Sequence, residues 1–97
     1  MNTITQQGNH WLIAGDLWVD NVSELLAKSA ALSMPSQLEI DFSAVTDSDT
    51  AALSLIMEWQ RRALAIGSTV TFKNLPANLS SLATLYGVTE FIPSIAS

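Results

Sequence analysis

The sequence predicts an α/β fold in which a mixed sheet of roughly four strands combines with about three helices, in the order ββαβαβα. Near its start, two segments of strand-forming residues flank a Gly-Asn turn, which is typical of a β-hairpin. Segments with helical periodicity then alternate with short strand-like segments. Because strands separated by single helices favour right-handed crossovers, we expect the later strands to lie parallel.

The first two predicted strands cover residues 3–6 and 10–14. Gly8 and Asn9 lie between them and suit the positive φ angles of a tight turn. The Gly15-Asp16 pair is then expected to break the second strand. The hairpin therefore contributes the antiparallel pair of the mixed sheet.

Residues 21–32 are predicted to form the first helix. Their apolar side chains recur at helical spacing, at Val22, Leu25, Leu26 and Ala30. The helix is expected to end before Pro35, because proline disfavours helical backbone in the residue that precedes it. Residues 37–42 then alternate apolar with polar side chains, which predicts a short strand.

The longest helical pattern covers residues 50–66 and ends at Gly67, which suits a left-handed C-terminal cap. Residues 69–73 are strand formers and predict the last strand. Pro76 suits the first turn of a third helix over residues 77–86, which is expected to end at Gly87.

A helical wheel at about 100° per residue divides the predicted helix over residues 50–66 into two faces. The face expected to pack on the core contains Ala52, Leu53, Ile56, Trp59, Ala63 and Leu64. The face expected to meet solvent or a partner contains Thr50, Ser54, Met57, Glu58, Arg61 and Arg62. Thr50 begins this second face at the positive end of the helix, where a phosphoryl group or an acidic partner is stabilised.

The composition excludes several kinds of site. The chain has 97 residues, which suits one domain over residues 1–97, and its formal net charge is −5. Its four basic residues form no run, so neither nucleic acid nor an anionic lipid surface is an expected partner. The chain has no cysteine and one histidine, so we expect no thiol chemistry, no metal site and no cofactor.

The sequence also predicts a cytoplasmic location. The N-terminus lacks a basic segment followed by an apolar one. No stretch approaches the roughly 20 apolar residues that cross a bilayer. We therefore expect no direct insertion into a membrane.

A polar segment before the predicted helix 50–66 is the candidate functional site. Every residue from Thr46 to Thr50 carries a hydroxyl or a carboxylate group, and we expect them to form a loop after a strand that ends at Val45. Helix capping accounts for one of these residues, because a Ser, Thr or Asp side chain at a helix start accepts from free backbone N–H groups. The remainder lie where open α/β sheets place ligand and partner contacts. The segment contains no histidine, cysteine or lysine, so we expect no catalytic residue and no enzyme.

The run IDFSAVTDSDTAAL at residues 40–53, an apolar strand followed by an Asp-Thr pair at a helix start, resembles the signature of STAS domains, named for sulfate transporters and anti-sigma-factor antagonists. AGDL at residues 14–17 resembles the family's turn after its second strand, and GSTVTF at residues 67–72 resembles its next strand. NLSSLATLYGVTEFIP at residues 78–93 is similar to the last helix and tail of the MlaB-like branch.

This resemblance implies a single STAS-like domain without catalytic activity. In the MlaB-like branch, such a domain binds and regulates the ATPase of an ABC transporter that moves phospholipids and maintains outer-membrane lipid asymmetry. The resemblance thus implies a cytoplasmic subunit that is peripheral to the inner membrane through its partner complex. The alternative within the family is an anti-sigma-factor antagonist, which an anti-sigma-factor kinase switches by phosphorylation.

The resemblance also implies which side chains meet the partner. The family's modifiable or partner-contacting hydroxyl corresponds to Thr50, preceded by Asp49. Ala51 and Ala52 stand where the family usually has glycine; alanine stabilises the helix but leaves less room for another backbone to approach. The expected partner-binding or phosphorylatable residues are Asp47, Ser48, Asp49, Thr50, Ser54, Met57 and Arg61.

Overall fold

A computed structural model of the chain describes residues 2–85 and 94–95. The elements are β1 (Thr3–Gln7), β2 (His10–Leu17), α1 (Val22–Ala30), β3 (Gln37–Ser48), α2 (Ala51–Ile66), β4 (Thr69–Lys73), α3 (Ala77–Leu85) and β5 (Ser94–Ile95). The predicted order ββαβαβα is confirmed over the first seven elements, and the two-residue strand β5 follows them.

The strands form one mixed sheet in the spatial order β1-β2-β3-β4-β5. β1 and β2 pair antiparallel, as the hairpin prediction requires, and Gly8 turns between them with a φ of 60°. Glycine suits this turn because a positive φ brings no steric penalty to a residue without a Cβ atom. The pairs β2–β3, β3–β4 and β4–β5 are parallel, which agrees with crossover connections through the helices.

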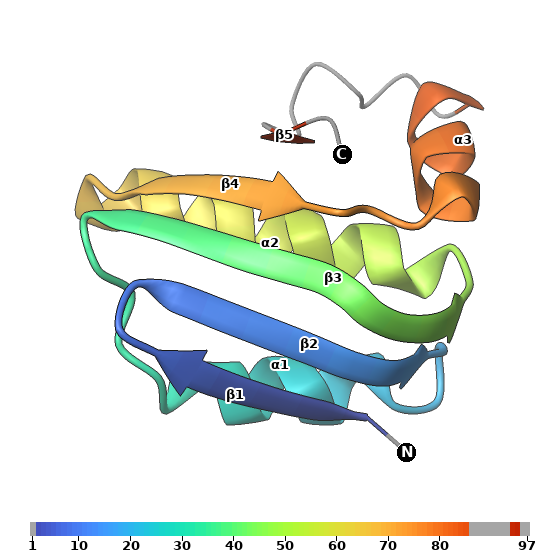
Figure 1. The fold of residues 1–97 in the computed structure, drawn as a ribbon, viewed down its shortest axis with the longest axis horizontal. Helices are drawn as coiled ribbons and strands as arrows, with labels where there is room; N and C mark the ends of the chain where they lie inside the picture. Colours follow the sequence, from blue (N-terminus) through green and yellow to red (C-terminus); the bar gives the residue numbers. More distant parts are fainter. Residues whose placement is uncertain (1, 86–93, 96–97) are drawn as a thin grey trace.

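Helices α1 and α2 cover one face of the sheet. Figure 1 shows both of them behind the strands, with α3 near the end of the sheet to which β3 points. Alternate side chains of the strands enter the layer between sheet and helices, because the side-chain period of a strand is two. The buried core consists of Trp11, Ile13, Leu17, Leu25, Leu38, Ile40, Phe42, Ala52, Leu53, Leu55, Ile56, Trp59, Ala63, Val70, Phe72 and Leu79.

Aromatic rings and one buried hydroxyl occupy the centre of this core. The rings of Trp11 and Trp59 meet edge to face, with 5.7 Å between their centroids. The indole N–H of Trp59 in α2 donates to Ser29 Oγ in α1 at 2.8 Å, which satisfies a polar group that has left water. Arg62 of α2 donates to the backbone oxygen of Ser29 at 2.9 Å. Hydrogen bonds as well as apolar packing therefore join the two helices.

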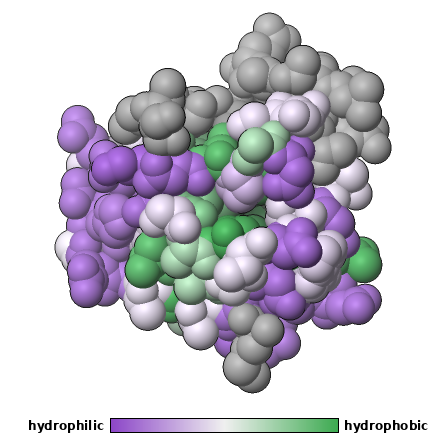
Figure 2. All heavy atoms as spheres, turned by 45° about the vertical axis from the view of Figure 1, so that its right-hand side comes forward, coloured by the Kyte–Doolittle hydropathy of each residue, from purple (hydrophilic) through white to green (hydrophobic). Residues whose placement is uncertain are grey.

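The opposite face of the sheet carries no helix in the part of the chain that the structure describes (Figure 1). Figure 2 turns the molecule so that the right-hand side of Figure 1 comes forward. It shows hydrophobic side chains near the middle of the molecule, between hydrophilic side chains on either side. Leu12 and Ala14 of β2 are half-buried and alternate with the core residues Trp11 and Ile13, so they belong to this open face.

Strands β2 and β3 are both longer than predicted. The predicted break at Gly15-Asp16 is wrong, because β2 continues to pair with β3 through these residues and on to Leu17. The ladder shifts register beside Gly15, whose φ of 93° only glycine adopts readily. β3 extends to Ser48, so the predicted loop over residues 46–50 shortens to its last two residues.

The helices begin and end close to the predicted residues. Gly67 ends α2 in the left-handed conformation with a φ of 73°, which confirms the predicted cap. α3 begins at Ala77, one residue after Pro76, as predicted. Its predicted end at Gly87 and the whole tail at residues 86–93 lie outside the described residues.

The predicted core face of α2 is correct except at Leu64, whose side chain is 70% exposed. Leu53 lies three turns earlier on the same side of the helix and is buried. α3 packs against α2 near this earlier end (Figure 1), whereas Leu64 lies in the last turn of α2, where Ala65 and Ile66 are exposed too. Leu55, which the wheel left out, is also buried.

Candidate functional site

The carboxyl ends of β2 and β3 lie side by side at one edge of the sheet (Figure 1). Their last paired residues are Asp16 with Asp47 and Leu17 with Ser48. The segments that lead from β2 into α1 and from β3 into α2 therefore leave the sheet together. In open α/β sheets this edge is where ligands and partners bind, so the predicted polar segment has the expected position in the fold.

Asp49 joins these two segments and caps α2. One carboxylate oxygen, Oδ1, accepts from the backbone N–H of Ala51 at 2.9 Å. The other oxygen, Oδ2, accepts from the N–H of Val19 at 3.0 Å, and the N–H of Asp49 donates to the backbone oxygen of Leu17 at 3.0 Å. Asp49 is thus the residue to which the predicted capping role belongs.

Thr50 lies on the surface at the first turn of α2. Its backbone is already helical, with φ −60° and ψ −22°, and its side chain makes no capping hydrogen bond. The side chain is exposed. Because Asp49 holds the helix start, the Thr50 hydroxyl is left facing solvent at the positive end of the helix.

Asp47 and Ser48 end β3 in different environments. Asp47 is exposed, and its Oδ1 accepts from the N–H of Ser48 at 2.9 Å. Ser48 is only 6% exposed, and the amide of Asn78 in α3 donates to both its Oγ, at 2.9 Å, and its backbone oxygen, at 3.0 Å. The structure therefore brings Asp47 to the surface with Thr50 and keeps Ser48 beneath it.

The three candidate residues farther along α2 extend the surface away from Thr50. Ser54 and Arg61 are exposed, and Met57 is half-buried against the core. Arg61 donates through Nε to Oε1 of Glu58 at 3.0 Å, and this bond holds the pKa of Glu58 below its ordinary value. Arg61 is thus already paired within the chain, and Thr50 and Ser54 are the candidate hydroxyls that stay exposed.

Two residues of this region were not singled out from the sequence. Val19, in the segment between β2 and α1, is 69% exposed although it is a large hydrophobic residue. Asn78, in α3, fixes the end of β3 through Ser48. The sequence signal for Val19 was its position directly before an acidic and an amide residue, Asp20 and Asn21, in a short connection. No local pattern indicated the bond from Asn78.

A second group of ionisable side chains lies on the open face of the sheet. His10 Nδ1 is 3.5 Å from Glu39 Oε2, and His10 Nε2 is 3.7 Å from Asp41 Oδ2. Burial raises the pKa of Asp41, but hydrogen bonds from Asn74 and from the N–H of Ser43 outweigh it, so this pKa lies below its ordinary value. Among the described residues, no group of three or more His, Cys, Asp or Glu side chains is arranged to hold a metal ion.

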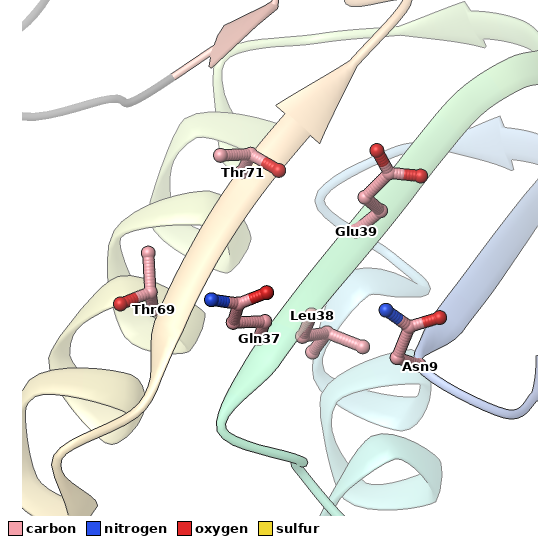
Figure 3. Close-up of a pocket in the computed structure, with 6 residues that line it drawn as sticks. All are labelled: Asn9, Gln37, Leu38, Glu39, Thr69 and Thr71. Carbon is pink, nitrogen blue, oxygen red and sulfur yellow. The ribbon is translucent and has the colours of Figure 1, made fainter.

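A hollow on the surface lies at the amino ends of the parallel strands, away from Thr50. Figure 3 shows polar side chains from β3 and β4 beside Asn9, which precedes β2. The hollow is lined by Asn9, Gln37, Leu38, Glu39, Thr69 and Thr71. None of the residues expected from the sequence to meet a partner lines it, so the hollow is separate from the candidate site.

Comparison with known families gives one match along most of the chain. A family model described as "Mlab, STAS domain" matches residues 3–93. No curated protein matches the sequence significantly. None of the helices in the described ranges is long and apolar enough to cross a membrane.

Solved structures with a similar fold include two forms of one regulatory protein. The anti-sigma-factor antagonist SpoIIAA in its unphosphorylated form has a TM-score of 0.74 and 14% identity, over 100% of this chain and 90% of that one. The phosphorylated form of SpoIIAA from Bacillus has a TM-score of 0.68 and 13% identity, over 100% and 93% of the two chains. A sulfate transporter family protein from Wolinella succinogenes has a TM-score of 0.66 and 14% identity, over 84% of this chain and 68% of that one. At these identities the likeness establishes the fold alone.

Proposed function

The chain belongs to the STAS domain family, and we propose from this membership that it is a non-catalytic cytoplasmic subunit that binds and regulates the ATPase of an ABC transporter moving phospholipids. The description of the matching family model names Mlab, which supports this branch of the family over others. The subunit would lie at the inner membrane through its partner complex and serve outer-membrane lipid asymmetry. The resemblance to the last helix and tail of the same branch covers residues 78–93, of which residues 86–93 lie outside the described residues.

The exposed hydroxyl of Thr50 is the observation that carries a docking function. Asp49 takes over helix capping and holds both adjoining segments, so the Thr50 hydroxyl has no capping bond to give up when a partner arrives. A side chain presented on a rigid base loses little conformational freedom on binding, which favours affinity. Thr50 and Ser54 lie one helical turn apart and would contact the ATPase together.

A surface of this kind regulates an ATPase by binding one of its conformations more tightly than another. The free energy of that preference shifts the population of ATPase molecules toward the favoured conformation. Binding also stabilises the folded ATPase by mass action. Neither effect needs a catalytic residue in the subunit.

A second function, an anti-sigma-factor antagonist, is favoured by the same exposed hydroxyl and by the fold shared with SpoIIAA. A phosphoryl group on Thr50 would add about two negative charges. These would lie beside Asp49 and close to Asp47, so like-charge repulsion would disturb a contact made by the unmodified surface. In this function the partner is an anti-sigma-factor kinase.

Titration of the purified ATPase with the wild-type protein, Thr50→Ala and Thr50→Glu tests the proposed docking. Loss of a buried hydroxyl contact typically costs about 1–3 kcal/mol, or roughly five- to more than a hundredfold in affinity, so Thr50→Ala should bind that much more weakly. Thr50→Glu should bind more weakly still, because it places a third charge beside two carboxylates. Thr69→Ala, at the far end of the sheet, is the matched control and should bind like the wild type.

The outcomes separate the two functions. Equal affinities for all four proteins would remove Thr50 from the interface. If the wild-type protein does not bind the ATPase, and purification from native membranes recovers an anti-sigma-factor kinase instead, the transporter function is wrong and the second function replaces it. Mass spectrometry of Thr50 in cells would then detect the phosphoryl group.

A further inference from the structure

Val19 is a hydrophobic residue held out into solvent beside the candidate site. It is 69% exposed, and the N–H of its backbone donates to Oδ2 of Asp49, the residue before Thr50. Two other large hydrophobic residues among those described are exposed to a similar extent, Leu64 at 70% and Ile66 at 58%. Both lie at the opposite end of α2 from Thr50. Single exposed hydrophobic residues are common, so the exposure of Val19 needs further support from its surroundings.

The segment that carries Val19 is fixed by a dense set of hydrogen bonds. The side chain of Asn21 accepts from the N–H of Trp18 at 2.9 Å, and the N–H of Asn21 donates back to the Trp18 backbone oxygen at 2.9 Å. The carboxylate of Asp16 accepts from the Trp18 indole at 3.0 Å and from the Asn21 amide at 3.1 Å. The backbone that carries Val19 is therefore held in place, which lowers the entropy lost when a partner covers it.

The charged side chains of the two connections beside Val19 all have the same sign. Between residues 16 and 21, and between residues 46 and 50, every charged side chain is an aspartate. Asp20 and Asp47 are the exposed ones among them. The two other aspartates, Asp16 and Asp49, already accept hydrogen bonds within the fold. Val19 is thus an apolar side chain on a surface whose exposed charged side chains, Asp20 and Asp47, are both carboxylates.

We propose that Val19 is an anchor of the docking surface, and that the partner protein receives it in an apolar recess bordered by basic side chains. This inference rests on the proposed docking function and identifies the chemistry of the partner surface. A buried apolar anchor accounts for affinity, while Asp20 and Asp47 attract and orient a basic surface. The two connections, before α1 and before α2, then act as one surface because Asp49 ties them together.

The first test measures binding of the purified ATPase by variants of Val19. Val19→Ser should weaken binding by about tenfold, because the apolar area that it buries is lost. Leu64→Ser removes an equally exposed hydrophobic side chain from the far end of α2 and should leave the affinity unchanged. The double variant Asp20→Asn with Asp47→Asn should bind more weakly at low salt and lose most of the salt dependence of the wild type. Glu39→Gln, on the open face, should keep that salt dependence.

The second test does not depend on the identity of the partner. The photo-crosslinking residue p-benzoylphenylalanine replaces Val19 in one variant and Leu64 in another, and each is irradiated in cells before the crosslinked peptide is identified by mass spectrometry. A crosslink from position 19 to the transporter ATPase, in a peptide with lysine or arginine beside the attachment point, supports both the proposed function and the anchor. A crosslink from position 19 to a basic peptide of another protein supports Val19 as an anchor and contradicts the transporter function. Three outcomes overturn the anchor. They are crosslinks from position 64 alone, no crosslink from either position, and a crosslink from position 19 to an acidic peptide.

Discussion

Replacing Asp49 by alanine should destabilise the protein far more than replacing Thr50, its neighbour. Asp49→Ala removes the acceptor for two backbone N–H groups, those of Val19 and Ala51. Loss of a capping side chain costs about 0.5–2 kcal/mol, and one further hydrogen bond contributes about 0.5–1.5 kcal/mol. We therefore expect the free energy of unfolding to fall by about 1–3.5 kcal/mol. Thr50→Ala removes an exposed side chain without a capping bond and should cost less than about 0.5 kcal/mol.

Urea unfolding followed by circular dichroism measures both variants against the wild type. For a protein of about this size, a loss of 2 kcal/mol lowers the melting temperature by roughly 8–16 °C, so thermal unfolding provides an independent reading. Asp49→Asn is the informative control, because its side-chain oxygen can accept one of the two bonds and the amide nitrogen cannot accept the other. It should be intermediate between wild type and Asp49→Ala.

A destabilisation by Thr50→Ala as large as that by Asp49→Ala would show that the capping role has been given to the wrong residue. So would an Asp49→Ala variant with wild-type stability. Either result would also weaken the case for docking, since that case depends on a Thr50 hydroxyl that the fold does not use.

Three further predictions concern the rest of the fold. Ile56→Ala should lower the free energy of unfolding by about 2–5 kcal/mol, because burial is lost and a cavity forms, whereas Leu64→Ala should cost less than about 1 kcal/mol. Urea unfolding measures both, and similar midpoints for the two variants would mean that α2 faces the core with a different set of side chains. Asn78→Ala should speed amide hydrogen exchange at the end of β3, because Ser48 loses its donor, and unchanged exchange there would contradict this link between α3 and β3. The folded pKa of Asp41 lies below its ordinary value of 3.8, so its ionised form stabilises the fold at neutral pH and that contribution is lost as the pH falls through the folded pKa. Asp41→Asn should therefore lose less stability than the wild type between about pH 5 and pH 2. If urea unfolding shows the same loss of stability with falling pH for both proteins, the lowered pKa of Asp41 is refuted.

The helices and the hairpin could be predicted because their signals are local. The spacing of apolar residues sets α1 and α2 within two residues of their observed ends, and Gly67 caps α2 as expected. Leu64 was wrongly assigned to the core because a helical wheel describes direction around a helix and not what covers each end of it. Leu53 is buried near the end of α2 against which α3 packs, whereas Leu64 lies in the exposed last turn of α2.

The ends of β2 and β3 could not be predicted, because their pairing joins residues about 30 positions apart in the sequence. Asp47 and Ser48 have the composition of a loop, yet the ladder with β2 keeps both in a strand. The candidate segment was found from its residue types, but the division of roles within it was not. Asp49 and Thr50 can both cap a helix, and a shift of the helix start by one residue decides which of them does.

The three tryptophans of the chain give the protein two kinds of optical probe. Trp11 and Trp59 are buried together in the core, so their emission should report on unfolding. Trp18 is half-buried, and its indole is hydrogen-bonded to Asp16 within the segment that presents Val19. A partner that binds this segment would change the surroundings of the Trp18 indole and leave those of Trp11 and Trp59 unchanged. The intrinsic fluorescence of the unlabelled protein can therefore distinguish docking from loss of structure.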